Sequence, residues 1–129
     1  MTQEEITINS ILALTKEGVL RWYVPQSDED PAPILPNYEK YITSNQDGSL
    51  FIIAKHLARK DKYVFFCLEN QSIPFAVEAG DLEDKFLLRT LFDYASQEFR
   101  QRYLEQLRKR LAELRNQKRP PETPPPPGV

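Results

Sequence analysis

The sequence predicts an α+β fold, with a four- or five-stranded antiparallel meander sheet, an N-terminal helix and a long C-terminal helix that precedes a disordered Pro-rich tail. Three observations support this prediction. Apolar residues recur at three- and four-residue spacing near the start of the chain, alternate with polar ones in short runs up to residue 78, and recur every four residues from Leu88 onward. The length of 129 residues suits one domain with a real core.

The first helix is predicted to begin at Thr2. Thr2 and Glu5 have the spacing of a capping box, in which each side chain accepts a hydrogen bond from the other residue's backbone N–H. Gly18 can end the helix, because glycine adopts positive φ at little cost. The amphipathic stripe between them consists of Ile8, Ile11, Leu12 and Thr15.

A first strand is predicted over residues 19–24, where Leu20, Trp22 and Val24 alternate with Val19, Arg21 and Tyr23. Pro25 ends this run, because proline has no N–H to donate to a neighbouring strand. Residues 25–37 contain four prolines and three consecutive acids, which predicts an extended surface loop.

Four further apolar runs predict the meander, over residues 38–45, 49–57, 62–69 and 72–78. Asp47-Gly48 between the first two supplies the positive φ angles of a tight hairpin. Pro74 in the last run predicts an edge or bulged strand.

The second helical region is predicted to open after Gly80, with Asp81 as N-cap and acidic residues in the first turn. Its apolar stripe drifts around the helix, because each four-residue step advances by about 40°. The early part, from Phe86 to Phe99, is expected to cover the sheet. The helix is expected to continue to about Gln117 and to stop before Pro120 and Pro121.

Charge divides the chain near residue 100. Residues 1–99 carry 9 Lys/Arg and 16 Asp/Glu, a net charge of −7, whereas residues 100–119 carry 8 basic and 2 acidic residues, a net charge of +6. We therefore divide the chain into a globular domain over 1–99, a basic helical extension over 100–118 and a disordered Pro-rich tail over 119–129. Such asymmetry favours an interaction surface over a reaction site.

The basic extension carries leucines at spacings of 3, 4 and 3, which is the spacing of a coiled-coil seam. The seam can pack on the chain's own sheet, can bind a second copy or a groove in a partner, or can stay solvated. The residues expected to bind the partner are Leu104, Leu107, Arg108, Leu111, Leu114 and Arg115.

These features predict a protein–protein interaction module, such as a small adaptor, assembly or regulatory factor, whose partner is another protein or a second copy in a homodimer. One alternative is a nucleic-acid-associated accessory protein that uses the basic helix. Its cations are spread around the helix and the rest of the chain is acidic, so nucleic acid is the less favoured partner. A small enzyme is the other alternative.

No assembled catalytic, cofactor or metal site is readable in the sequence. His56 is the only histidine and Cys67 the only cysteine, and no Cys/His cluster has zinc spacing. Both are expected to be structural, which favours a protein that is not an enzyme and needs no cofactor or metal. An aromatic group at Trp22, Tyr23, Tyr38 and Tyr41 is expected to belong to the core, or to anchor a partner if the loop 25–37 opens.

The expected location is the cytoplasm. No apolar stretch approaches the ~20 residues of a membrane span, and the first residues are acidic where a signal peptide would be basic. In the tail, Lys118, Pro121 and Pro124 fit a basic-x-x-Pro-x-x-Pro spacing, but a solvated tail is the favoured interpretation.

Overall fold

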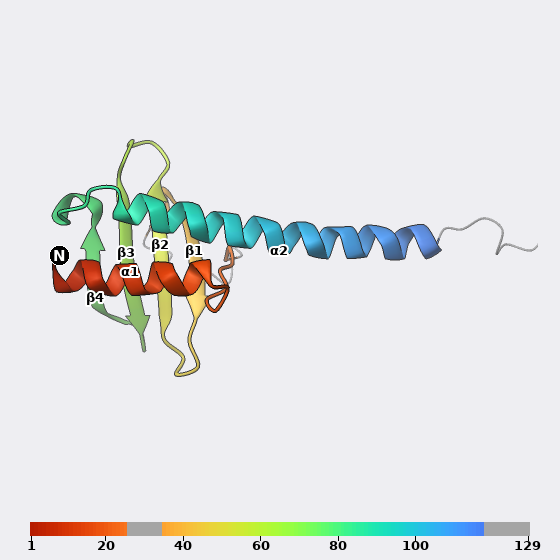
Figure 1. Ribbon diagram of the computed structural model, residues 1–129, viewed down its shortest axis with the longest axis horizontal. Helices are drawn as coiled ribbons and strands as arrows, with labels where there is room; N and C mark the ends of the chain where they lie inside the picture. Colours follow the sequence, from red (N-terminus) through yellow and green to blue (C-terminus); the bar gives the residue numbers. More distant parts are fainter. Residues whose placement is uncertain (26–34, 118–129) are drawn as a thin grey trace, which may run out of the picture. The chain divides into compact units, whose positions relative to one another are not determined.

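The computed structural model describes residues 1–25 and 35–117, and it confirms the α+β class (Figure 1). The chain forms two compact units, which divide between Phe99 and Arg100. The elements in chain order are helix α1 (Gln3–Lys16), strands β1 (Tyr38–Ser44), β2 (Leu50–His56), β3 (Tyr63–Glu69) and β4 (Ser72–Glu78), the short 3-10 helix η1 (Ala79–Asp81) and helix α2 (Leu87–Gln117).

The four strands form one antiparallel sheet in the order β1-β2-β3-β4, which is the predicted meander. The β1–β2 hairpin turns at Gly48, whose φ of +87° is the left-handed backbone that glycine accepts. Pro74 lies in β4 at the edge of the sheet, as predicted, so its missing N–H costs no interior ladder bond.

Helix α1 follows its predicted pattern closely. Both hydrogen bonds of the Thr2–Glu5 capping box are present, and Gly18 has φ +76° just after the helix. The side chains buried on the helix are Glu5, Ile8, Ile11, Leu12 and Thr15. The amphipathic stripe therefore faces the core, with Glu5 added to it.

The predicted strand over residues 19–24 is wrong, because within the described residues this segment makes only one isolated bridge, between Tyr23 and Ile42 of β1. Three of its other backbone N–H groups donate outside any sheet. The N–H groups of Val19 and Leu20 donate to the Leu14 carbonyl, which closes the end of α1. The N–H of Trp22 donates to the Glu98 carboxylate of α2 at 2.6 Å. In the described part of the chain the sheet accordingly has four strands.

The predicted start of the second helix is also wrong. Asp81 ends the 3-10 helix η1, and α2 begins only at Leu87. Between them, the Asp84 side chain accepts the N–H of Phe86, while the Asp84 N–H donates to Glu5 of α1 at 2.8 Å. Phe86 is 63% exposed instead of covering the sheet. Helix α2 is continuous as far as Gln117, the last described residue, so the prediction of helix up to that residue is confirmed.

The main core lies between the sheet and the two helices on one of its faces. A row of side chains in register crosses the sheet there: Tyr41, Ile53, Phe65 and Val77. These residues pack with α1 and with Leu88 and Leu91 of α2, and Figure 1 shows both helices across that face. The opposite face has a smaller cluster of Ile42, Ile52 and Phe66. The sheet is therefore apolar on both faces.

Two predictions concern segments outside the described residues. Most of the acidic, Pro-rich loop 25–37 lies in residues 26–34, and the predicted disordered tail over 119–129 lies wholly beyond residue 117. Both stay predictions.

Candidate functional site

The second unit contains the candidate interaction surface, on residues 100–117 of α2, which we call the arm. Leu104, Leu111 and Leu114 are 50%, 54% and 44% exposed, and Leu107 is half-buried. At 100° per residue, these four leucines fall within an arc of about 80°. The helix thus gathers them on one side, and we call this set the leucine stripe.

Arginines border the leucine stripe on both sides. Arg108 and Arg115, which the sequence singled out, follow one edge of the stripe, and Arg110 follows the other edge. All three are exposed. Glu105 and Glu113, the acids of the arm, lie on the opposite side of the helix, about 140° from the middle of the stripe. The stripe is therefore an apolar strip with cationic borders.

Arg110 was missed as a candidate site residue. The basic residues of the arm are spread around the whole helix, so their number alone does not distinguish the three arginines beside the leucine stripe from the other basic residues. Heptad position does distinguish them. If Leu104 and Leu111 are placed at position a, Arg108 and Arg115 fall at position e. Arg110 then falls at position g. In a coiled coil, the e and g positions flank the seam and face the partner helix.

His56 has a structural role in the first unit. Its Nδ1 accepts the N–H groups of Ala58 and Arg59, at 3.0 and 2.9 Å, and so holds the turn after β2. Its ring meets Tyr38 edge-on, with centroids 4.9 Å apart. A ring nitrogen that accepts two backbone bonds is engaged in the turn, and these contacts give it no catalytic partner.

Cys67 lies half-buried on β3, beside Phe51 and Phe75 in the register. Burial raises the pKa of its thiol, and the charge of Glu69 raises it further. Both effects disfavour the thiolate, which is the nucleophilic form. The environment of Cys67 is the opposite of one that activates a cysteine.

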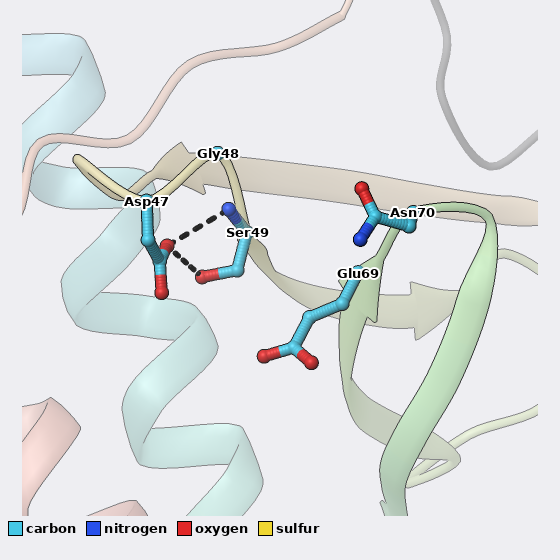
Figure 2. Close-up of a pocket in the computed structure, with 5 residues that line it drawn as sticks. All are labelled: Asp47, Gly48, Ser49, Glu69 and Asn70. Atoms are coloured by element: carbon cyan, nitrogen blue, oxygen red, sulfur yellow. Dashed lines mark hydrogen bonds between the residues drawn. The ribbon is translucent and has the colours of Figure 1, made fainter.

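One hollow of the first unit lies between two turns and is polar. It is lined by Asp47, Gly48, Ser49, Glu69 and Asn70. Figure 2 shows Asp47 joined to Ser49 by two hydrogen bonds, from the N–H at 2.9 Å and from the hydroxyl at 2.6 Å. These bonds, the hydroxyl first, lower the pKa of Asp47. The Asp47 carboxylate thus serves the hairpin turn.

A second hollow lies beside β1 and is more apolar. Its described lining residues are Val24, Pro25, Leu35, Pro36, Tyr38, Glu39 and Lys40. It borders the predicted aromatic group, which the structure divides. Trp22 and Tyr41 are buried in the core, whereas Tyr23 is 37% exposed and Tyr38 is half-buried at this hollow.

Among residues 1–25 and 35–117, no group of three or more His, Cys, Asp or Glu side chains is placed to hold a metal ion. In the same part of the chain, no helix has the length and apolarity needed to cross a membrane. Comparisons with protein-family models, with curated proteins and with solved structures found no match.

Proposed function

We propose that this protein is a protein–protein interaction module, an adaptor, assembly or regulatory factor that binds its partner through the arm. The observation that carries the proposal is the exposure of the leucine stripe on α2. An exposed leucine row on a helix is the feature that helix-in-groove and coiled-coil partners recognise.

The cost of leaving the stripe in water supports the proposal. Burying apolar surface yields roughly 25 cal/mol per Å², so each half-exposed leucine offers a partner a favourable contact. Four leucines over residues 104–114 span about 15 Å along the helix, at 1.5 Å per residue. That length suits a short, reversible interface better than a large obligate one.

Direct nucleic-acid binding is the less supported alternative. Arg108, Lys109 and Arg110 follow one another along the arm, so they point about 100° apart and do not form one face. Phosphate contacts from one groove need cations on one side of the helix. Binding to nucleic acid would also give the leucine stripe no role.

The proposal is tested by changing Leu107 and Leu111 to Asp in the full chain. We expect the first unit to stay folded, judged by near-ultraviolet circular dichroism of buried Trp22, while capture of the native partner is lost. The matched control is Gln106→Asp with Asn116→Asp, which adds the same charge away from the stripe and should preserve capture.

Two results would contradict the proposal. Unfolding of the Leu107→Asp, Leu111→Asp protein would place the stripe in the folded core. Equal loss of capture in the control would show that added negative charge, not the loss of leucine, is responsible. A salt-dependent affinity for labelled DNA or RNA that needs Arg108, Lys109 and Arg110 would favour the nucleic-acid alternative.

A further inference from the structure

From the borders of the leucine stripe we infer that its partner is a different protein with an apolar surface flanked by carboxylates, and not a second copy of the stripe. This inference rests on the proposed function and specifies the partner's chemistry. Arg108, Arg110 and Arg115 are the residues that carry it, because they occupy the heptad positions that meet a partner helix.

A parallel pair of two arms places like charges together. In that arrangement the g position of one helix faces the e position of the next heptad in its partner. Here Arg110 meets Arg115 of the second copy, and the contact occurs twice by symmetry. Acids that would compensate are absent from these positions, because Glu105 and Glu113 lie on the far side of the helix.

An antiparallel pair has the same difficulty. Positions e then face each other, so Arg108 of one copy meets Arg115 of the other, again twice. The seam also cannot be lengthened toward the first unit to offset this repulsion, because Arg100 occupies the preceding d position. Two heptads alone are marginal for a coiled coil, and like charges at the borders make self-pairing weaker still.

A partner with carboxylates beside an apolar strip turns the same three arginines into attractive groups. Arg can form bidentate bonds to a carboxylate, and its charge raises the rate of encounter with an acidic surface. Exposed ion pairs are individually weak, so the preference depends on all three arginines acting together. The three favour an acidic partner over a basic one by about tenfold or more.

The test uses the full chain and synthetic three-heptad helical peptides, with binding followed by fluorescence anisotropy. All carry leucine at a and d, and their e and g positions are Glu, Gln or Lys. We expect the Glu peptide to bind about tenfold more tightly than the Gln peptide, and the Lys peptide to bind least. A polyglutamate peptide without leucines should bind far more weakly than the Glu peptide.

The charge-reversed protein Arg108→Glu, Arg110→Glu, Arg115→Glu should invert this order and prefer the Lys peptide. The single variant Arg110→Glu should make self-pairing easier, because a carboxylate at that g position would then face Arg115 of a second copy. Its molecular mass in light scattering should rise at protein concentrations where the natural chain stays monomeric.

The two proposals fail in different ways. Equal binding of all three leucine peptides would overturn the acidic partner while leaving the leucine stripe as a docking surface. A natural chain that dimerises at low micromolar concentration, and loses the dimer in Leu107→Asp, Leu111→Asp, would make a second copy the partner. Absence of binding to every peptide without self-association would overturn both proposals. Tighter binding to phosphatidylserine vesicles than to the Glu peptide would make a membrane surface the partner.

Discussion

Leucines in the two parts of helix α2 have opposite environments. Leu88 and Leu91, in the first unit, are fully buried, whereas Leu104 and Leu111, in the arm, are about half-exposed. The residue type and the helical backbone are the same in both parts. The buried pair packs with the sheet and α1, so it contributes to folding. The exposed pair leaves about half of its surface in water, and this contrast is the basis of the functional proposal.

The largest expected effect comes from truncating one leucine in each part. Leu91→Ala removes a fully buried side chain and should lower the free energy of unfolding by about 2–5 kcal/mol. Leu111→Ala removes a half-exposed one and should change it by about 0.5 kcal/mol at most. Urea denaturation followed by circular dichroism measures both. Similar losses in the two variants would mean that the arm's leucines belong to the folding core.

A smaller effect is expected from the buried hydroxyl that joins α1 to Trp22. Thr15 Oγ1 accepts a hydrogen bond from Trp22 Nε1 at 3.1 Å, inside the core. Thr15→Val leaves that buried N–H without its acceptor, which should cost about 1–3 kcal/mol. Thr7 is the matched control. The Thr15 hydroxyl donates to the Ile11 carbonyl, and the Thr7 hydroxyl likewise donates to the carbonyl four residues earlier, but Thr7 is exposed. Thr7→Val should leave the denaturation midpoint nearly unchanged, and an equal loss in both variants would assign the effect to helix propensity.

A pH-dependent effect is expected at Glu5. Its carboxylate accepts the N–H of Asp84 at 2.8 Å and that of Thr2 at 3.1 Å, and these bonds, Asp84 first, lower its pKa from 4.5. Because the folded-state pKa is the lower one, the stabilisation is present above about pH 4.5 and is lost as the pH falls through the folded value. Glu5→Gln should therefore reduce the melting temperature at pH 7 and flatten its decline in acid.

The control for Glu5 is its neighbour Glu4 in the same helical turn, which is exposed. Glu4→Gln should preserve the slope of melting temperature against pH. If Glu5→Gln preserves it as well, the acid sensitivity arises from other carboxylates, of which Asp47 is the first to examine because its pKa is also lowered.

Local signals were sufficient to predict much of this fold. The capping box, the Asp47-Gly48 turn and the edge position of Pro74 each depend on residues close together in the sequence. The two errors involve bonds between distant residues. The Glu98 carboxylate accepts a hydrogen bond from the N–H of Trp22, 76 residues away in the sequence. The Glu5 carboxylate accepts one from the N–H of Asp84, 79 residues away. No local pattern in residues 19–24 or 81–86 reveals those partners.

The candidate site could be predicted only in part, for a related reason. The spacing of Leu104 to Leu114 identifies one side of a helix, since helical periodicity is a local property. Whether a leucine row is buried depends on which other surfaces it meets, and the exposures of the structure supply that information. The role proposed for Arg110 likewise depends on its position beside the stripe and not on its charge alone.

The smallest effect on global stability is expected within the arm itself. An isolated helix of this length is only marginally stable in water, so the backbone amides of residues 100–117 should exchange with solvent much faster than those of residues 88–99. Amide hydrogen exchange followed by NMR measures both segments in one experiment. We expect protection to fall by at least about tenfold from the first segment to the second, because the first is opened mainly by global unfolding.

Two alanines of α2 give this last prediction its matched variants. Glycine costs a helix about 1 kcal/mol relative to alanine. Ala112 is exposed in the arm, so Ala112→Gly should speed exchange there and reduce helical circular dichroism without moving the thermal midpoint. Ala95 is fully buried in the first unit, so Ala95→Gly should lower that midpoint. A midpoint lowered equally by Ala112→Gly would show that the arm unfolds together with the first unit, and the contrast between the two parts of α2 would then be lost.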